Sequence, residues 1–478
     1  MPACPRFVPL PLTASTPFPP TRPAGRGPLR FPHGAAEHLF LWVYHGLWHL
    51  LLPLVLWLMW RKGRREPLYR AHWGERLGKL DTALQRPLWV HSSSMGELRG
   101  AAPLIHALLA RGFPVLLTTF TPAGRSAARQ LFAQAMDEGQ LQVAYQPLEL
   151  GWAIDRLIQR VQPRCAIMTE IDTWPVLLHR LHRRGIPLVM ANAQYPRKSL
   201  ARDLRWWGLR SAVFRCYDLV LCKSTTHAER FARVGCPRVE VAGETRFDLP
   251  IPAAQLAAAA RCVASQGLAP GQRPVLCVAS SVMGEDEQFM QAFAQVRDGL
   301  KAAGLPAPLF VHVPRSPQRF DAVASMFQSA GWRLARRSQC LDAELALQPG
   351  ASLAEVDVLL GDSLGEMFFY LALSQAVVVG ASFVPLGAHN VIEPLALKKP
   401  VMVGPSVWGI EYPGVEAMAA GVLQQLPDMP ALAACWLRLM TDPNGYAAAI
   451  AGVERFYAEH AGATERHLGV LLPWLEAH

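Results

Sequence analysis

The chain has 478 residues, of which 51% are hydrophobic and 18% are charged, and its formal net charge is +10. This composition excludes a disordered or fibrous protein and leaves room for two or three domains with full cores. The nine cysteines form no Cys-x-x-Cys pair and no cluster with histidines, so we expect neither a zinc site nor a disulfide framework. A reduced cytosolic setting fits this pattern best.

The first segments of the chain point to a membrane. Residues 1–36 are rich in proline and arginine and lack the apolar stretch of a signal peptide, so we interpret them as disordered or as a start-site extension. Residues 38–60 contain no Asp, Glu, Lys or Arg and are long enough, as a helix, to span a hydrocarbon core of about 30 Å. Three histidines and Pro53 in this stretch keep a tilted or interfacial anchor equally open. We therefore expect a membrane-anchor segment over 37–65.

A basic run over residues 61–79 directly follows the apolar stretch. Basic residues beside an apolar segment stay in the cytoplasm and attract anionic headgroups, so this run predicts a membrane surface as a partner. Nucleic acid is the competing partner of a basic chain. The sequence contains no recognition-helix motif and no basic stripe interleaved with aromatic residues, so we expect no nucleic-acid partner.

From residue 88 onward, short apolar runs alternate with helical patterns. Seven such runs precede residue 250 and five follow residue 270, which predicts two parallel sheets covered by helices on both faces. We therefore predict an α/β fold with two doubly wound halves, 66–250 and 251–445, and a C-terminal helix over 446–478 that could pack back on the first half. Because ligands bind at the carboxyl ends of parallel strands, we expect the site in a cleft between the carboxyl ends of the two sheets.

The stretch LWVHSSSMGELRGAAPLIHAL, residues 88–108, changes from strand to helix near Glu97. Ser94 and Glu97 are spaced as a capping box, in which a hydroxyl and a carboxylate satisfy free amides at a helix start. The same loop, which includes Gly96, ends a strand of a parallel sheet, where ligands also bind. The spacing alone leaves both roles open.

Two further strand ends in the first half carry polar residues. Thr121 and Gly124 lie in TTFTPAGR, and Glu170 and Asp172 lie in MTEIDTWP. Two acids at one strand end can act as general acid and base. They can equally cap a helix or pair with arginines.

The stretch VVVGASFVPLGAHNVIEP is the strongest single motif. Gly380 and Gly387 would let the backbone approach a ligand, and a helix beginning over His389 to Glu393 would present free amides to a phosphate or carboxylate. Asn390 can cap that helix, and Glu393 can accept from ribose hydroxyls. The alternative is structural, with the glycines serving only tight turns.

Upstream, GDSLGEM repeats this design, with Ser363 and Gly365 at a strand end and Glu366 in the first turn of a helix. Arg246 in GETRFD and Arg315 in VPRSPQRF are candidates for binding anions, although ordinary surface roles fit them as well. The sequence contains no Walker motif, nucleophile elbow or HExxH zinc motif.

Together these motifs resemble the 3-deoxy-D-manno-octulosonic acid (Kdo) transferases, which move Kdo from CMP-Kdo to the lipid A precursor in lipopolysaccharide assembly. The resemblance covers about residues 40–470 and rests on YRAHWGERLG, HSSSMGE, TTFTPAG, GIPLVMANAQ, GETRFD, GDSLGEM and FVPLGAHNVIEP. It implies two Rossmann-like domains in the GT-B arrangement, with the acceptor domain over 66–250 and the nucleotide-sugar domain over 251–445. It also implies a protein on the cytoplasmic face of the bacterial inner membrane, with the lipid surface as a partner.

The resemblance assigns roles to the motif residues. Glu97 corresponds to the catalytic base that takes the proton of the acceptor hydroxyl, with inversion at the Kdo anomeric carbon. No metal or cofactor is implied. The implied donor-binding residues are Arg246, Arg315, Ser363, Gly365, Glu366, Gly380, Gly387, His389, Asn390 and Glu393. The implied acceptor or cleft residues are Ser94, Gly96, Thr121, Gly124, Glu170 and Asp172.

The chain departs from the family pattern at three positions. It has Gln194 where the family usually has Arg, and Val282 and Ser316 where the family usually has His. These departures keep two alternatives open: a related GT-B enzyme with another donor or acceptor, and a membrane-attached binding protein that has lost catalysis. Because Glu97 is present, we favour a transferase.

Overall fold

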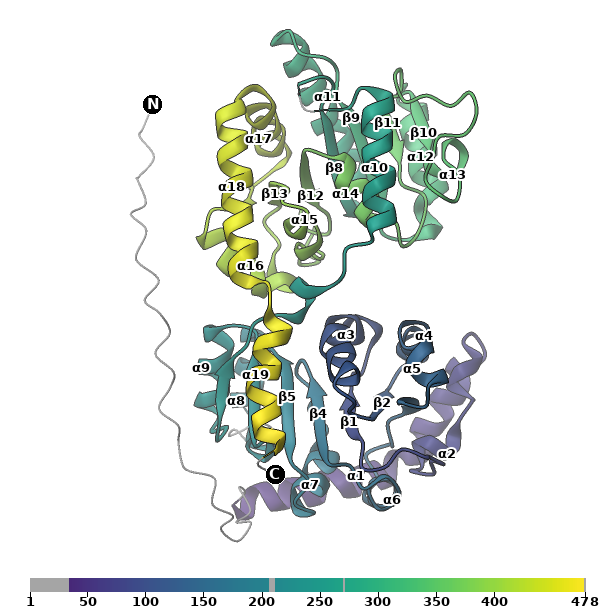
Figure 1. Cartoon of the computed structure of the whole chain (residues 1–478), viewed down its shortest axis with the longest axis vertical. Coiled ribbons are helices and arrows are strands. Elements are labelled where there is room, and N and C mark those ends of the chain that lie inside the picture. The colour runs from purple at the N-terminus through teal and green to yellow at the C-terminus, as the bar shows by residue number, and fades with distance from the viewer. Residues whose placement is uncertain (1–33, 206–210, 270, 477–478) are drawn as a thin grey trace. The chain divides into compact units, whose positions relative to one another are not determined.

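The computed structural model describes residues 34–205, 211–269 and 271–476. Most of the extension predicted over 1–36 therefore lies outside the described residues. The chain divides into two compact units, which we call unit 1 (Met1–Gly243 with Thr464–His478) and unit 2 (Glu244–Ala463). Figure 1 shows that each unit has its own parallel sheet with helices on both faces.

Unit 1 contains a parallel sheet of seven strands in the order β3-β2-β1-β4-β5-β6-β7. The strands of the central part are buried on both faces, which is why they read as continuous apolar runs in the sequence. The strand order reverses between β1 and β4, and such a switch point is where α/β sheets bind ligands. The strands are β1 (Leu88–His91), β2 (Val115–Thr119), β3 (Leu141–Tyr145), β4 (Cys165–Thr169), β5 (Leu188–Ala193), β6 (Leu219–Cys222) and β7 (Val239–Val241).

The helices of unit 1 cover both faces of this sheet. One core packs α6 and α7 against the sheet, and the other packs α3 and α19 against the opposite face. The helices are α1 (Ala35–Lys62), α2 (Trp73–Arg76), α3 (Met95–Ala110), α4 (Pro122–Leu131), α5 (Ala133–Asp137), α6 (Gly151–Val161), α7 (Pro175–Arg183), α8 (Arg197–Arg205), α9 (Thr225–Arg233) and α19 (Ala463–Glu476), with 3₁₀ turns η1 (Pro67–Tyr69) and η2 (Ser211–Cys216).

Unit 2 repeats the plan with a seven-stranded parallel sheet in the order β10-β11-β9-β8-β12-β13-β14. The sequence predicts five of these strands. The two edge strands, β10 and β14, are three residues long and partly exposed, so they leave no apolar run to detect. The strands are β8 (Val275–Ser281), β9 (Leu309–Pro314), β10 (Leu334–Arg336), β11 (Val358–Leu360), β12 (Ala376–Val379), β13 (Val401–Val403) and β14 (Leu423–Gln425).

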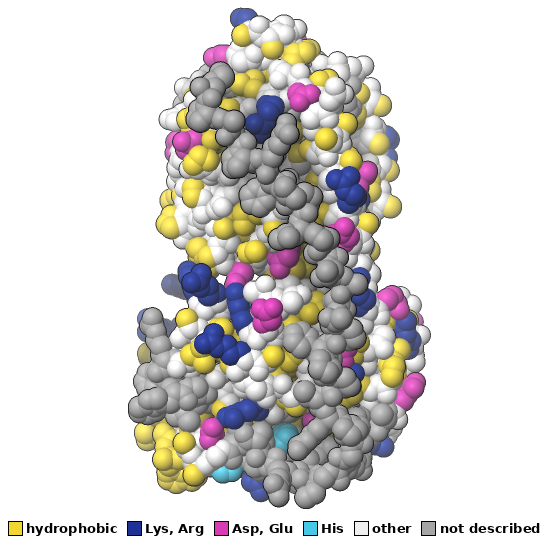
Figure 2. Space-filling view, turned by 90° about the vertical axis from the view of Figure 1, so that its left-hand side faces the viewer, with side chains coloured by type: hydrophobic (Ala, Val, Ile, Leu, Met, Phe, Trp, Pro, Cys, Tyr) yellow, Lys and Arg dark blue, Asp and Glu magenta, His cyan; other side chains and the backbone are white. Residues whose placement is uncertain are grey.

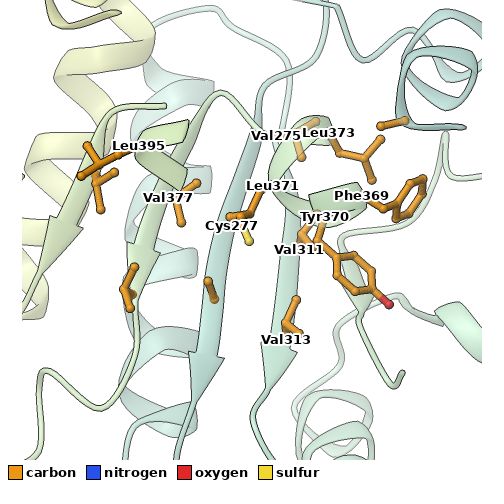
Figure 3. Close-up of a cluster of buried hydrophobic side chains, with 14 of the residues drawn as sticks. Val275, Cys277, Val311, Val313, Phe369, Tyr370, Leu371, Leu373, Val377 and Leu395 are labelled. Carbon is orange, nitrogen blue, oxygen red and sulfur yellow. The ribbon is translucent and has the colours of Figure 1, made fainter. Parts of the chain in front are cut away.

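One core of unit 2 lies under the short helix α14, where Phe369, Leu371 and Leu373 pack against Val275 and Val377 of the sheet (Figure 3). The helices of this unit are α10 (Ala253–Gln266), α11 (Asp286–Ala302), α12 (Phe320–Ser329), α13 (Arg337–Cys340), α14 (Met367–Leu373), α15 (Ile392–Ala396), α16 (Glu411–Ala419), α17 (Met429–Thr441) and α18 (Pro443–His460), with 3₁₀ turns η3 (Thr245–Asp248), η4 (Pro317–Arg319) and η5 (Trp408–Ile410). The α/β fold predicted from the alternating pattern is confirmed.

The single C-terminal helix predicted over 446–478 is wrong, because two helices occupy this stretch. Helix α18 ends at His460, since Ala461 is extended and Gly462 takes a positive φ of 76°. Helix α19 then packs into the core of unit 1 through Leu468, Leu471, Trp474 and Leu475. The chain therefore begins and ends in the same unit.

Helix α1 contains the apolar stretch of residues 38–60. Within the described ranges it is the one helix that is long and apolar enough to cross a membrane, by length and composition alone. Its 28 residues run along unit 1 beside α6 and α7 (Figure 1).

Candidate active site

The candidate site of unit 1 lies where β1 and β4 end. Ser94 caps α3, and its hydroxyl accepts a hydrogen bond from the Glu97 amide at 3.4 Å. The Glu97 carboxylate accepts in turn from the amide of Ser93 at 2.8 Å, one residue earlier than an ordinary capping box. The predicted capping geometry is therefore confirmed, and it holds the Glu97 carboxylate at the helix start. Gly96 lies exposed beside it.

Glu97 is half-buried, and its pKa is raised above the usual value for a carboxyl group. Burial is the largest cause and the negative charge of Glu170 is the next, while the hydrogen bonds from Ser93 and Ser94 act in the opposite direction. A carboxylate with a raised pKa is a stronger base. The position therefore suits a group that accepts a proton from a substrate.

Asp172 reaches the same loop from the end of β4. One carboxylate oxygen, Oδ1, accepts from the Ser93 hydroxyl at 2.8 Å and from the Trp174 indole at 3.2 Å. The other, Oδ2, is buried without a hydrogen-bond partner among the described residues, 3.4 Å from His91 Nε2. Burial, and then the charge of Glu97, raise the pKa of Asp172 well above its usual range. Burial also lowers the pKa of His91 to about 3, so the imidazole is neutral.

Glu170 follows β4 directly and is buried in an ion pair. Its carboxylate lies 2.9 Å from Lys223 Nζ and accepts a hydrogen bond from the side-chain amide of Asn192, Nδ2, at 3.4 Å. Lys223 also donates to Gln194 Oε1 at 3.3 Å, so the departure at Gln194 belongs to this cluster. Glu170 and Asn192 both take positive φ values, 64° and 53°, an uncommon backbone conformation for side chains of this kind. The ion-pair interpretation of Glu170 holds, with lysine as the partner in place of arginine.

Thr121 and Gly124 bring a second helix start beside the Ser93 loop. The Thr121 hydroxyl caps α4 by accepting from the Gly124 amide at 3.1 Å, and the Thr121 amide donates to the Ser93 carbonyl at 3.3 Å. A Cβ on Gly124 would lie 3.3 Å from Thr119 Cβ and 3.5 Å from the Ser94 carbonyl carbon. A side chain at this position would therefore be crowded, and glycine favours close packing of the two helix starts.

The candidate site of unit 2 lies where β8 and β12 end, at the switch point of that sheet. The glycine motif begins here, and Gly380 is packed so tightly that a Cβ would lie 2.5 Å from the Ser280 carbonyl oxygen. Gly387 has a φ of 94°, and a Cβ there would lie 2.7 Å from the Trp408 ring. Both glycines are thus required by the loop's own packing.

Glu285 organises this loop, and the sequence reasoning missed it. Its buried carboxylate accepts from the amides of Ala381, Ser382 and Phe383 at 2.7, 3.0 and 2.9 Å, and from the amide of Val282 at 3.1 Å. The signal was present in the sequence, because SSVMGE in unit 2 matches SSSMGE in unit 1 and places Glu285 where Glu97 stands. The two acids occupy equivalent places at the two switch points.

The helix predicted from His389 begins three residues later, at Ile392, and is one turn long. The amides of Ala388 and His389 donate to the carbonyls of Ala381 and Gly380 at 2.9 and 3.1 Å, which holds this stretch in a loop. Asn390 is not the N-cap residue, which is Val391, but its Oδ1 accepts from the first helical amide, that of Ile392, at 3.0 Å. Glu393 lies in the first turn of the shortened helix.

His389 and Arg315 lie together, with 2.9 Å between His389 Nδ1 and Arg315 Nη1. Burial, and then the charge of Arg315, lower the pKa of His389 to about 4, so the ring is neutral and Nδ1 accepts. The other nitrogen, Nε2, carries the proton and is buried without a hydrogen-bond partner in the described part of the chain. This arrangement leaves an N–H donor beside an exposed guanidinium.

The predicted residues of GDSLGEM form an internal network. Arg337 holds Glu366 with two hydrogen bonds of 2.6 Å, and Ser363 donates to the same carboxylate. Glu366 is the residue before α14, so its predicted place in the first turn is wrong by one position. The carbonyl of Gly365, where φ is 83°, accepts from Gln255 at 2.8 Å.

The remaining predicted arginine, Arg246, and the departure at Ser316 lie in or beside short 3₁₀ turns. Arg246 Nη1 is 3.6 Å from Glu244 Oε2 in η3, and Arg319 pairs with Asp286. Ser316 precedes η4. Among the described residues, no group of three or more His, Cys, Asp or Glu is placed to hold a metal ion.

The sequence of the chain is similar to that of known proteins. Residues 71–249 match the family described as "3-Deoxy-D-manno-octulosonic-acid transferase (kdotransferase)". The 3-deoxy-D-manno-octulosonic acid transferase of Bordetella pertussis is 37% identical over 432 residues, which cover 89% of this chain and 97% of that protein. The corresponding protein of Haemophilus influenzae is 29% identical and covers 91% and 98% of the two chains.

Among solved structures, Glycyrrhiza uralensis UGT73P12, complexed with glycyrrhetinic acid 3-O-monoglucuronide, has a TM-score of 0.55 at 9% identity. The likeness covers 83% of this chain and 96% of that one, and it concerns the fold alone. Two units with parallel sheets of this kind define the GT-B fold of glycosyltransferases. The chain belongs to the 3-deoxy-D-manno-octulosonic acid transferase family. The resemblance inferred from the motifs is confirmed.

Proposed function

We propose that the protein is an inverting glycosyltransferase that moves Kdo from CMP-Kdo to lipid IVA, the lipid A precursor, in lipopolysaccharide biosynthesis. The observation that carries this proposal is Glu97, held by the Ser93 amide at the switch point of unit 1 with its pKa raised by burial. Membership of the family supports the donor sugar, and the names of the relatives support transfer of that sugar.

Glu97 acts as the general base in this proposal. Its carboxylate takes the proton from the acceptor hydroxyl while the hydroxyl oxygen attacks the anomeric carbon of Kdo. The new carbon–oxygen bond forms as the bond to the phosphate oxygen of CMP breaks, and CMP leaves with the electron pair. Attack opposite to the leaving group inverts the configuration. A positioned base of this kind contributes about 10²–10⁴-fold to the rate.

The donor half of the proposal rests on unit 2. CMP-Kdo carries two negatively charged groups, a phosphate and a sugar carboxylate. In unit 2 the Arg315 guanidinium, a cation, lies beside the His389 ring, which supplies an N–H donor. These groups would stabilise the charge that develops on the departing CMP, with Arg246 as a further cation. Asn390 and Glu393 would bind polar groups of the nucleotide, while Gly380, Gly387 and the network of Ser363, Gly365 and Glu366 keep the loops in shape.

The acceptor half rests on unit 1. Ser94, Gly96, Thr121 and Gly124 form the two helix starts beside Glu97, and we propose that the acceptor sugar binds against them. The negative charge of Glu170 raises the pKa of Glu97 and so supports its basicity. The scheme needs no metal, since arginine and N–H groups supply the positive charge.

We further propose that the protein works at the cytoplasmic face of the bacterial inner membrane. The acceptor is a lipid, and CMP-Kdo is a soluble nucleotide sugar, so both are available only where the cytoplasm meets that membrane. Helix α1 and the basic residues behind it supply the attachment.

A related GT-B enzyme with a different acceptor is the second candidate, because Gln194 stands in the Lys223–Glu170 cluster where the family usually has arginine. Incubation of the purified protein with CMP-Kdo and lipid IVA separates the candidates. We expect mass spectrometry of the lipid to show added Kdo, and NMR of the product to show an inverted anomeric centre. Absence of transfer to lipid IVA, with CMP-Kdo bound and another acceptor used, would favour the second candidate.

A further inference from the structure

Helix α1 has two different long faces. One face is buried or half-buried at a spacing of three or four residues over its whole length. Its members are Glu37, Phe40, Leu41, Tyr44, His45, Trp48, Leu52, Val55, Leu56 and Met59. This periodicity indicates a helix that packs on unit 1 along one stripe and leaves the opposite stripe uncovered.

Polar and apolar contacts hold the packed stripe at both ends. Near its start, Glu37 pairs with Arg215 at 2.9 Å, and the Gly151 amide donates to His45 Nε2 at 2.9 Å. Near its end, Met59 is buried in a cluster with Leu148, Leu150 and Ala153. Unit 1 therefore contacts α1 from its first turn to its last.

The length of this contact decides the orientation of the helix. From Glu37 to Met59 a helix rises about 33 Å, which equals or exceeds a hydrocarbon core of about 30 Å. If α1 crossed a bilayer while packed in this way, Arg215 and the buried carboxylate of Glu149 beside Tyr44 would enter the hydrocarbon with it. Charged groups there are very costly. The packed stripe is therefore incompatible with a spanning helix.

The opposite face of α1 is apolar and exposed, and no Asp, Glu, Lys or Arg occurs between His38 and Trp60. Trp42 and Leu50 are exposed by 76% and 75%. Other exposed members are Leu39, Val43, Leu47, Leu51, Leu54, Trp57, Leu58 and Trp60. Figure 2 shows hydrophobic side chains gathered at the lower margin of the molecule, at the level of α1 in Figure 1. An uncovered apolar face of this length marks an interaction surface.

Basic residues at the end of α1 identify the partner. Arg61 lies over the Trp57 ring at 5.5 Å, and Arg64 and Arg70 lie over the Trp60 ring at 5.0 and 4.4 Å. Tryptophan beside arginine is the pattern expected at the boundary between acyl chains and anionic headgroups. The charge and the apolar face thus fit an anionic bilayer surface better than a second protein.

We propose that α1 lies in the plane of an anionic membrane leaflet, with its exposed face among the acyl chains, and does not cross the bilayer. The inference deepens the proposed function, on which it rests for the lipid acceptor. Phe120 packs in the same cluster as Met59, and its ring lies 5.1 Å from that of Trp174, which donates to Asp172. A helix held flat on the leaflet would thereby fix the distance of the candidate site of unit 1, with Glu97, from the acceptor's leaflet.

Depth measurements with spin labels test this orientation without using activity. Single cysteines would replace Leu39, Leu50 and Leu58 in the full chain with Cys4→Ser, since the other cysteines are buried. In vesicles of phosphatidylethanolamine and phosphatidylglycerol we expect all three labels at one shallow depth, about 5–10 Å below the headgroups. A label at Leu50 near the bilayer centre, with those at Leu39 and Leu58 near opposite surfaces, would overturn the inference.

A charge-insertion pair tests the surface itself. We expect Leu47→Glu with Leu54→Glu to lower vesicle binding at least tenfold and to leave CMP binding unchanged, whereas the exposed control pair Gln134→Glu with Gln159→Glu should change neither. Loss of self-association with unchanged vesicle binding would overturn the inference and assign this face to a second copy.

The rate of Kdo transfer to detergent-dispersed lipid IVA is measured separately, because it tests the proposed function and not the orientation of α1. Shallow labels without transfer would contradict the proposed function alone, and transfer with spanning labels would contradict this inference alone.

Discussion

Ser93 donates a hydrogen bond from its hydroxyl to Asp172 Oδ1 at 2.8 Å, while its backbone amide binds the Glu97 carboxylate at the same distance. One residue at the end of β1 therefore joins two acids whose pKa values are both raised. The charge of Glu97 disfavours ionisation of Asp172, so Glu97 is the acid of this pair that carries the charge. The catalytic proposal depends on an ionised Glu97.

The pH profile of transfer tests the charge environment of Glu97. We expect kcat/KM to rise with pH, since Glu97 acts only when ionised and its pKa is raised. Glu170→Gln removes the negative charge that raises the pKa of Glu97, so the rise should move to lower pH. The control Asp155→Asn removes a carboxylate that pairs with Arg180 on the surface of unit 1 and should leave the profile in place. An unchanged profile in Glu170→Gln would show that the charge of Glu170 does not reach Glu97.

Glu285 offers a second prediction, for the loop that follows Gly380. Glu285→Gln has one acceptor oxygen in place of two, so it leaves buried amides of the loop without partners. We expect the free energy of unfolding to fall by about 3 kcal/mol, for two charge-assisted hydrogen bonds lost, and CMP to bind more weakly. Urea unfolding and calorimetric titration with CMP measure these effects. Glu287→Gln, on the exposed side of the same helix, is the matched control. Equal stability and CMP affinity in both variants would remove Glu285 as the organiser of this loop.

The helix start at Ile392 is expected to serve the donor and not the acceptor. Asn390→Ala loses the acceptor of the Ile392 amide, and Glu393→Ala loses a carboxylate in the first turn. Both changes should raise the KM for CMP-Kdo several-fold more than the KM for lipid IVA, with Asn444→Ala as an exposed control. Steady-state kinetics with each substrate varied in turn provide the comparison, and equal effects on both constants would place this turn outside the donor site.

Glu149 makes stability depend on pH. Burial raises its pKa to about 7, while its carboxylate accepts from the amides of Val176 and Leu177 at the start of α7. A carboxyl pKa that is higher in the folded protein than in the unfolded chain means that the folded form keeps the proton. Its contribution to stability is therefore present at low pH and lost as pH rises from about 4.5 through 7.

Glu149→Gln mimics the protonated form, so it should remove this dependence. Relative to the original protein, we expect the free energy of unfolding of the variant to increase by up to about 3 kcal/mol between pH 4.5 and 7.5, which means greater relative stability at the higher pH. Denaturant unfolding at several pH values measures this difference. A difference that stays constant over this range would mean that Glu149 does not titrate there.

Much of the fold could be predicted because its central strands are buried on both faces and leave apolar runs in the sequence. The edge strands β10 and β14 could not, since Leu334–Arg336 and Leu423–Gln425 are short and partly exposed. The helix start at Ile392 was misplaced because hydrogen bonds from Ala388 and His389 back to residues 380–381 hold that stretch in a loop. Such tertiary bonds have no local signal.

In the candidate site, too, residues with a local sequence signal could be predicted, and residues that depend on tertiary contacts could not. Glu97 could be singled out because a carboxylate at a strand–helix junction has a readable spacing. Lys223, Arg337 and His91 were missed, since each gains its role only when a distant strand end brings Glu170, Glu366 or Asp172 beside it. Glu285 was within reach, because its motif repeats that of Glu97.

The most direct test of the account is the transfer rate of Glu97→Gln. The glutamine keeps the shape of the side chain and an oxygen for the Ser93 amide, so the fold and CMP binding should be preserved. It cannot accept the acceptor's proton, and we expect single-turnover transfer from CMP-Kdo to lipid IVA to fall by a factor on the order of 100 or more. Near-normal transfer in this variant, with CMP binding intact, would contradict the assignment of Glu97 as the base.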